Sequence, residues 1–339
     1  MFWDGVAQQA AGLSGGGIEA LVSPPPAAVQ ERRTRPKIGL ALGGGAARGW
    51  SHIGVLRTLM QAGIVPDVIA GCSVGAVVGG CYAADKLDEV EAFARSLTKR
   101  RVMGLLDFHI SGSGLIAGGR LKRLLDQDLG GLRIESLPLR FVTIATELGT
   151  GHEIWLTKGD LISALRASYA LPGVFDPVFF GGRWLMDGAL VNPVPVTAAR
   201  ALGADIVICV NLNGDIKVRG TVIQSHGGDA VDEIAEAVVE GAPRRWGLFG
   251  QGRSIDRPVP QAPGITAVMI DAFNITQDRI ARSRLAGDPP DVMIAPKLSP
   301  IGLFEFHRAA ETIDLGRQAT ERVLPDIMEM IQDAAATVA

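Results

Sequence analysis

The chain has 339 residues, 47% of them hydrophobic and 20% charged, so it can bury a large core within one domain. Its formal net charge of −3 argues against general nucleic-acid binding, because phosphate contacts require a pronounced basic surface. The three cysteines, Cys72, Cys81 and Cys209, show neither a disulfide framework nor metal-ligand spacing, so a reducing compartment, the cytoplasm, is expected.

Residues 1–36 are expected to form a flexible leader. The stretches 14–17 and 23–26 are rich in glycine, serine and proline, as linkers are. A secretory signal is not predicted, because Asp4 falls early and no basic residue precedes Glu31. The basic segment 32–37 could touch anionic lipid, although a solvated linker is favoured. The longest apolar run, 74–84, is too short to span a bilayer.

From Lys37 onward, strand and helix patterns alternate, which predicts an α/β three-layer sandwich with a mostly parallel central sheet. Strands are expected near residues 37–43, 67–71, 139–147, 152–157, 178–186, 205–212 and 291–295. Helices are expected near residues 46–62, 74–84, 87–98, 119–128, 159–168, 194–202, 265–284 and 304–336. One domain, 37–339, is therefore predicted, interrupted by an insertion at about 213–264.

A glycine-rich turn, residues 43–49, follows the first strand and leads into a helix. Such a turn gathers backbone N–H groups and attracts negative charge. A dinucleotide fingerprint would need glycine where Arg48 stands and an acid at the end of the second strand. Asp67 precedes that strand instead, so an oxyanion hole is favoured over a nucleotide loop.

The second turn, Gly71-Cys72-Ser73-Val74-Gly75, follows another buried strand and opens another helix. A serine at so sharp a turn is held out of the fold with its hydroxyl exposed, and flanking glycines avoid clashes in the bend. The helix that begins there directs its positive end toward a developing oxyanion. Ser73 is therefore a candidate nucleophile.

The third feature is Asp187, which follows an apolar strand and precedes Gly188 and Ala189. Asp-Gly by itself is typical of a plain turn. Together with the glycine-rich turn and the serine turn, it indicates a carboxylate at a strand end.

The expected insertion contains an acidic amphipathic stretch and ends in an apolar and basic segment. That segment, which we call the lip, comprises Arg244, Arg245, Trp246 and Phe249 with their neighbours. Apolar groups beside cations suit the boundary of a lipid surface, so the lip could face a membrane beside the active site. Its aromatic residues could equally pin the insertion onto the core. Both interpretations stay open.

In this order the three turns resemble those of the patatin-like phospholipases. Residues 39–56 resemble the bacterial branch related to neuropathy target esterase, and residues 167–177 are similar to the family's segment before its catalytic acid. The resemblance covers roughly residues 37–212, with a weaker echo in 291–316. It implies a patatin-like fold and a Ser-Asp dyad, in which Asp187 accepts the proton of Ser73 without an intervening histidine.

The family's glycine loop maps onto Gly44, Gly45 and Gly49, with Arg48 at its basic position. The N–H groups of Gly44, Gly45 and Val74 are expected to hold the oxyanion. Supporting roles are expected for Arg48, Gly49, Gly71, Gly75 and Gly188. The chain departs from the family pattern at Ala46, where many members carry a third glycine. The Cβ atom of Ala46 restricts the φ angle of the turn.

A Ser-Asp-His triad would require His226 or His307 after Asp187. The first lies among turn-forming residues and the second at the expected start of a helix, and neither carries a signature. His52 is expected to be a hydrogen-bonded structural residue. A dyad is therefore favoured.

These features predict a serine acyl hydrolase of lipid esters, either a phospholipase A or a lysophospholipase-like esterase. Its substrate would be a phospholipid or lysophospholipid, and no metal or organic cofactor is implied. Peripheral contact with the inner membrane face is an additional expectation. Two alternatives remain: acyl transfer to an acceptor other than water, and a regulatory or membrane scaffold built on an inactive domain. The intact serine, aspartate and glycine loop count against the scaffold.

Overall fold

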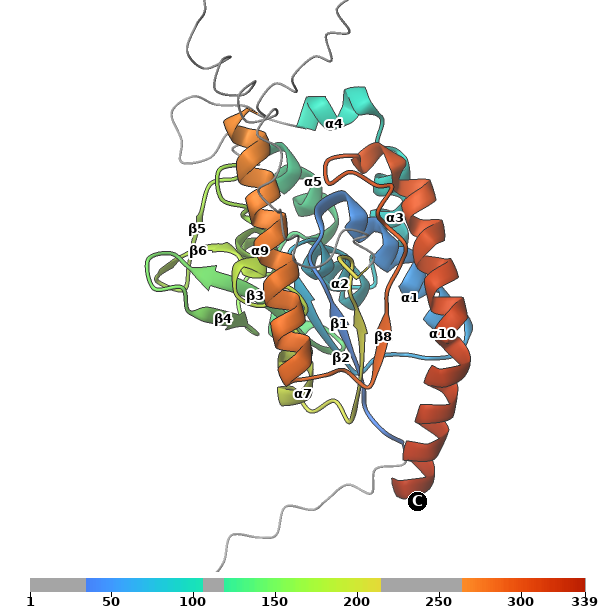
Figure 1. Ribbon diagram of the computed structural model, residues 1–339. Coiled ribbons are helices and arrows are strands. Elements are labelled where there is room, and N and C mark those ends of the chain that lie inside the picture. Colours follow the sequence, from blue (N-terminus) through green and yellow to red (C-terminus); the bar gives the residue numbers. More distant parts are fainter. Residues whose placement is uncertain (1–34, 106–118, 215–263, 339) are drawn as a thin grey trace, which may run out of the picture. The chain divides into compact units, whose positions relative to one another are not determined.

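A computed structural model describes residues 35–105, 119–214 and 264–338, which belong to one compact unit, Arg35–Ala339. In this part of the chain eight strands form one sheet, with the order β5-β6-β3-β2-β1-β7-β8 and with β4 paired to β3 (Figure 1). The strands are β1 (Ile38–Leu42), β2 (Val68–Cys72), β3 (Arg140–Glu147), β4 (Glu153–Leu156), β5 (Val178–Phe180), β6 (Arg183–Asp187), β7 (Ile206–Val210) and β8 (Val292–Ile294).

Five neighbouring strands, β3, β2, β1, β7 and β8, run parallel. β4 and β6 are antiparallel to β3, and β5 is antiparallel to β6. The carboxyl ends of the parallel strands share one edge, which is where α/β sheets place their ligands. The expected mostly parallel α/β sheet is confirmed.

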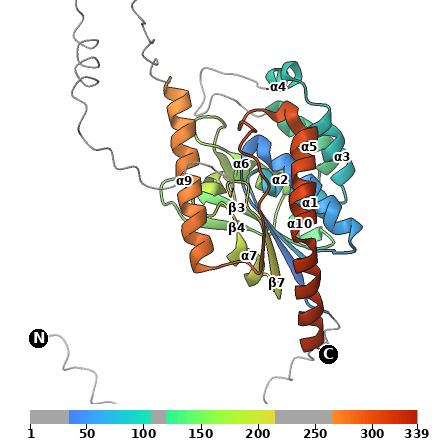
Figure 2. The ribbon, with the colours of Figure 1, turned by 45° about the vertical axis from the view of Figure 1, so that its right-hand side comes forward.

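The described helices lie on both faces of the sheet, and Figure 2 shows α9 and α10 on opposite sides of it. The α-helices are α1 (Ser51–Gln61), α2 (Val74–Ala83), α3 (Leu87–Arg95), α4 (Lys99–Leu105), α5 (Gly119–Leu129), α6 (Leu161–Tyr169), α7 (Val196–Ala201), α9 (Ile265–Gly287) and α10 (Ala309–Val338). Short 3-10 turns are η1 (Ala46–Trp50), η2 (Ile134–Ser136), η3 (Gly188–Leu190) and η4 (Phe306–Arg308).

Side chains alternate between the two faces of the central strands, and this alternation explains the three layers. In β1, Leu40 and Leu42 belong to a core shared with α1, α2, α6 and α10, whereas Ala41 belongs to a second core shared with α7 and α9. Successive strand residues point to opposite faces, so a strand that is apolar throughout needs helices on both sides. All of β1 and β2 is buried, which fits this arrangement.

The helices α1 and α10 pack unusually closely, and two glycines permit it. A Cβ atom on Gly54 would collide with the backbone carbonyl of Ile313, and one on Gly316 would collide with that of Ser51. Each helix thus presents a glycine to the backbone of the other. Since α1 follows the glycine-rich turn directly, this contact anchors the turn to the C-terminal helix.

Two local expectations were wrong. The segment 178–186 forms two strands, because Gly181 and Gly182 adopt φ angles of 58° and 81° and close a hairpin between β5 and β6. The helix α4 was not predicted, because its seven residues, three of them basic, carry too short a pattern to distinguish from a loop. Nearly all of the leader, nearly all of the insertion and the whole of the lip lie outside the described residues. No helix among the described residues is long and apolar enough to cross a membrane.

Candidate active site

Three turns meet at the carboxyl edge of the parallel strands. The glycine-rich turn follows β1 and Ser73 follows β2, and these strands are neighbours, with Leu42 paired to Gly71. Asp187 ends β6 and pairs with Ala145 of β3, one residue beyond the last β2–β3 pair of Cys72 with Ile144. The register therefore carries Asp187 to the place where β2 has ended.

The hydroxyl of Ser73 donates a hydrogen bond to Oδ2 of Asp187 at 2.8 Å. The other carboxylate oxygen, Oδ1, accepts the N–H of Ala189 at 2.9 Å, and Thr146 Oγ1 donates to the backbone carbonyl of Asp187 at 2.8 Å. Both members of the pair are buried, with 8% of Ser73 and 2% of Asp187 exposed. The predicted pair is therefore assembled, with its carboxylate fixed on both oxygens.

Ser73 adopts a backbone conformation rare for a residue with a side chain, with φ of 54° and ψ of −124°. Strain of this kind persists only where the surroundings hold it. Here the N–H of Ser73 donates to Oγ of Ser168 at 2.9 Å, and Ser168 Oγ donates to the carbonyl of Ile144 at 2.6 Å. Ser168 was missed as a site residue, although it lies in the segment 167–177 that carries part of the family resemblance.

Burial raises the pKa of Asp187 to about 7, and the hydrogen bonds from Ala189 and Ser73 oppose that rise. A carboxylate whose pKa lies near neutrality can both take and return a proton at physiological pH. The thiol of Cys72, beside Ser73, is also buried, and burial with the nearby charge of Asp187 raises its pKa well above its usual value. Cys72 is thus a neutral packing residue.

The glycine-rich turn is held by backbone bonds at its start. Gly43 N–H donates to the carbonyl of Val210 at 3.1 Å, and His52 Nε2 donates to the carbonyl of Gly43 at 2.8 Å. Gly44 N–H donates to the carbonyl of Pro193 at 3.0 Å, so the structure does not support Gly44 as an oxyanion donor. Gly44 instead leaves room beside the serine, because a Cβ atom there would lie 3.4 Å from that of Ser73.

Two of the three expected donors remain. Among the described residues, no acceptor takes the N–H of Gly45 or that of Val74, the first residue of α2. Ala46, which directly follows Gly45, has a left-handed φ of 48°. Alanine therefore occupies a conformation that favours glycine, at the position where many family members carry one.

The expected supporting glycines mark close backbone contacts. A Cβ atom on Gly49 would collide with the side chain of Val74, and one on Gly75 would collide with the carbonyl of Leu42. Gly71 and Gly188 are equally confined, the first against Ala76 of α2 and the second against the carbonyl of Ile144. These glycines let α2 pack closely against η1, β1 and β2, and let η3 pack closely against β3, which positions the serine, the turn and the aspartate.

No described histidine bonds to the serine or the aspartate. His52 is fully buried, and burial lowers its pKa to about 4 against the opposing bond to Gly43, so it stays neutral. This confirms the structural role expected for His52. His307 lies in η4, and His226 lies outside the described residues.

Arg48, the basic residue of the turn, directs its Nε to the carbonyl of Ile301 at 2.9 Å. Its neighbour Ala47 donates its N–H to the carbonyl of Leu303 at 2.9 Å. The segment between β8 and α10 therefore lies against the glycine-rich turn. Sequence reasoning noted only a weak echo there, because backbone carbonyls carry no side-chain signature.

The chain is similar to several known proteins. The sequence model of the family described as patatin-like phospholipase matches residues 40–200. An uncharacterized NTE family protein of Mycobacterium tuberculosis is 33% identical, over 93% of this chain and 99% of its own length. Lysophospholipase NTE1 of Yarrowia lipolytica is 27% identical over 86% of this chain, which spans 20% of that protein. Among solved structures, VipD from Legionella pneumophila matches with a TM-score of 0.43 and 13% identity, over 87% of this chain and 67% of that one.

Proposed function

The chain belongs to the patatin-like phospholipase family, in its NTE branch, and on this premise we propose that it hydrolyses lipid esters with a dyad of Ser73 and Asp187. Family membership makes the chain a lipid carboxylic ester hydrolase. The dyad, the acyl-enzyme and the substrate class are the proposal. Phospholipids and lysophospholipids are the substrates we propose, because a relative bears the name lysophospholipase.

In the first half-reaction, Ser73 Oγ attacks the ester carbonyl carbon while Asp187 Oδ2 takes the hydroxyl proton. The carbonyl oxygen becomes an oxyanion, which the N–H groups of Gly45 and Val74 stabilise in this proposal, since neither group has an acceptor among the described residues. Collapse of the tetrahedral intermediate breaks the bond to the leaving alcohol, which receives the proton from Asp187. An acyl-serine remains.

In the second half-reaction, water attacks the acyl-serine and gives a proton to Asp187. The fatty acid is released, and the Ser73 oxygen takes the proton back from Asp187, which restores the free hydroxyl. Each half-reaction thus uses the same acid-base group and the same oxyanion site, as microscopic reversibility requires. No histidine is needed, because a carboxylate with a pKa near 7 can serve as both base and acid.

The observation that carries this proposal is the 2.8 Å hydrogen bond between Ser73 and Asp187 at a strained strand-to-helix turn. A structural Ser-Asp pair would not require the φ of 54° that Ser73 adopts. It also would not require a carboxylate kept out of water, whose burial is costly.

Product analysis tests the proposal. The wild type and Ser73→Ala are incubated with defined phospholipids, lysophospholipids and a short-chain ester, and the products are identified by mass. We expect free fatty acid from at least one phospholipid class with the wild type, and none with Ser73→Ala. Fatty acid release by Ser73→Ala at the wild-type rate would exclude Ser73 as the nucleophile.

A further inference from the structure

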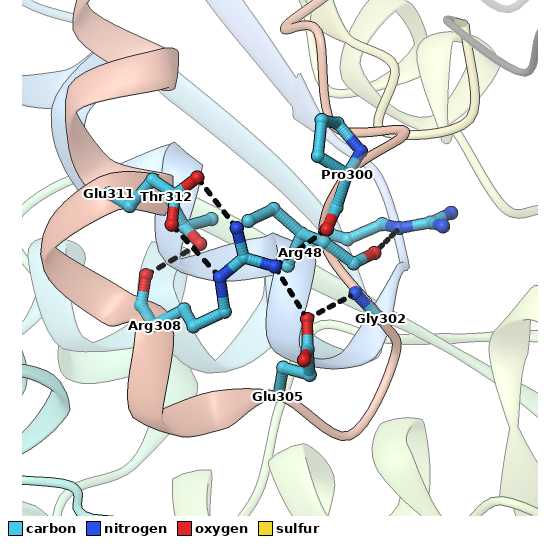
Figure 3. A network of polar contacts seen from close by, with 8 residues as sticks. Arg48, Pro300, Gly302, Glu305, Arg308, Glu311 and Thr312 are labelled. Atoms are coloured by element: carbon cyan, nitrogen blue, oxygen red, sulfur yellow. Dashed lines mark hydrogen bonds and ion pairs between the residues drawn. The ribbon is translucent and has the colours of Figure 1, made fainter.

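Arg308 occupies the centre of a polar network between β8 and the start of α10 (Figure 3). Its Nε and one terminal nitrogen bond to both oxygens of Glu311, at 2.9 and 2.7 Å. Its other terminal nitrogen donates to the carbonyl of Pro300 at 2.6 Å and to Oε2 of Glu305 at 2.7 Å. A planar guanidinium suits such a fixed set of acceptors better than any other side chain.

The network fixes a short segment, residues 300–305, which we call the strap. Pro300 and Glu305, at its two ends, are both bonded to Arg308. Oε2 of Glu305 also accepts the N–H of Gly302 at 2.9 Å, within the strap. One arginine therefore sets the path of the six residues, and only 27% of its side chain is exposed.

The strap turns its carbonyls toward the glycine-rich turn. The carbonyl of Ile301 accepts Arg48 Nε, and that of Leu303 accepts the N–H of Ala47, both at 2.9 Å. Ala47 directly follows Ala46, the alanine in the left-handed conformation. Strained backbone of this kind holds only where neighbouring bonds fix it. The two strap carbonyls supply such bonds immediately after the strained residue.

We propose that Arg308 is a positioning residue for the oxyanion site, acting through the strap on the turn that contains Gly45 and Ala46. Arg308 touches neither the serine nor the aspartate through any contact the structure describes; its effect travels through Pro300 and Glu305 to Ile301 and Leu303, and from there to Arg48 and Ala47. This inference rests on the proposed function, because the turn must bind an oxyanion for its position to matter.

A matched control lies on the same helix. Arg317 of α10 also pairs with two acids, Asp314 and Glu321, at 2.7 and 2.6 Å. The side-chain partners that the structure describes for Arg317 all lie on α10, so removing it deletes comparable ion pairs without loosening the strap. Arg308→Met and Arg317→Met therefore differ in their connection to the turn.

The test measures kcat and KM for a soluble short-chain ester at a temperature where every variant is folded. Because the oxyanion forms only in the transition state, misplacing its donors lowers kcat and leaves KM nearly unchanged. We expect kcat of Arg308→Met to fall about 10-fold, less than the 10²–10³-fold loss on removing a donor outright. Arg317→Met should keep the wild-type kcat.

A double-mutant cycle with Arg48→Met adds a second readout. If Arg308 acts through the bond between Arg48 and Ile301, its replacement should cost less in the Arg48→Met background than in the wild type. If Arg308→Met does not fold, Arg308→Lys replaces it in both tests, since lysine cannot pair both oxygens of Glu311 and should still lower kcat severalfold.

Equal kcat values for the Arg308 and Arg317 variants would overturn the inference, even if both lowered the melting temperature, because Arg308 would then be structural only. Strictly additive effects in the cycle would overturn the route through Arg48. Failure of the proposed function looks different: the wild type itself would then cleave no ester, whatever the state of Arg308.

Discussion

Asp187 is a carboxylate with 2% of its surface exposed, bonded to one hydroxyl and one backbone N–H. These two bonds favour its charged form, but the loss of water outweighs them, so burial raises the pKa of Asp187 to about 7. The same residue therefore determines the pH range of the chemistry and a pH-dependent part of the stability.

The proton-accepting form of Asp187 prevails only above its pKa. We expect kcat/KM for a soluble ester to rise with pH and to level off above an apparent pKa of about 7. A stopped assay across pH 5 to 9, in buffers of constant ionic strength, measures this. A profile that is flat down to pH 5 would contradict the assignment of Asp187 as the base.

Asp187→Asn should lower turnover by roughly 10²-fold or more, the usual scale of general-base loss. It should also stabilise the protein above neutral pH. The pKa of about 7 in the folded protein lies above the ordinary aspartate value of 3.8, so the native state binds the extra proton between these two pH values. The free energy of unfolding of the wild type therefore decreases as pH rises from about 3.8 to about 7. Asparagine does not titrate, so the variant does not lose this stability.

Thermal unfolding of both proteins at pH 5 and pH 8 measures this effect. The melting temperature of Asp187→Asn should exceed that of the wild type by more at pH 8 than at pH 5. An equal difference at the two pH values would mean that the carboxyl is not buried with a raised pKa in solution.

Ala46 is held at a φ of 48° beside the proposed oxyanion donors. A side chain costs energy there and glycine does not, so Ala46→Gly should stabilise the fold by roughly 0.5–1 kcal/mol after the entropy of glycine is subtracted. Ala47→Gly is the control. The buried Ala47 has no positive φ, so this substitution should destabilise the fold. Chemical denaturation measures both, and a destabilised Ala46→Gly would show that the strain is absent.

At the scale of elements, the pair of α1 and α10 depends on glycine rather than on large side chains. Gly54 and Gly316 allow each backbone to touch the other helix, and Gly54 lies in α1, which follows the glycine-rich turn directly. Two C-terminal segments, the strap and α10, thus both fix the position of the glycine-rich turn.

Gly54→Ala should destabilise the fold by about 1–3 kcal/mol or more, because its methyl group would collide with the carbonyl of Ile313. Gly104→Ala in α4 is the control, since nothing lies within 4 Å of a Cβ atom there. It should be neutral or stabilising, as alanine favours helix. Equal melting temperatures for the two variants would show that α1 and α10 do not pack this closely.

At the scale of the whole molecule, local pattern predicted most of the sheet and the three turns of the site. The Ser73 turn and the carboxylate of Asp187 could be predicted because sharp bends require glycine and are therefore visible in sequence. The meeting of the glycine-rich turn with the Ser73 turn also followed from the carboxyl ends of two neighbouring parallel strands, whereas Asp187 arrives on the antiparallel strand β6. The hairpin of β5 and β6 was missed, because an apolar run does not reveal a two-glycine turn within it.

The long-range bonds could not be predicted. Gly44 was expected to be an oxyanion donor, yet its N–H is taken by a carbonyl almost 150 positions later, that of Pro193. Ser168 and Arg48 likewise bond to backbone groups that are distant in sequence, those of Ser73 and Ile301. Any residue has a carbonyl, so such partners leave no signature in sequence and appear only in the folded chain.

The central claim is that Ser73 is an activated nucleophile paired with Asp187. The most direct measurement is mass mapping of the site labelled by a fluorophosphonate, in the wild type, Ser73→Ala and Asp187→Asn. The account predicts one adduct, on Ser73, at full occupancy in the wild type, none in Ser73→Ala and much slower labelling in Asp187→Asn. An adduct on another residue, or undiminished labelling of Ser73→Ala, would contradict it.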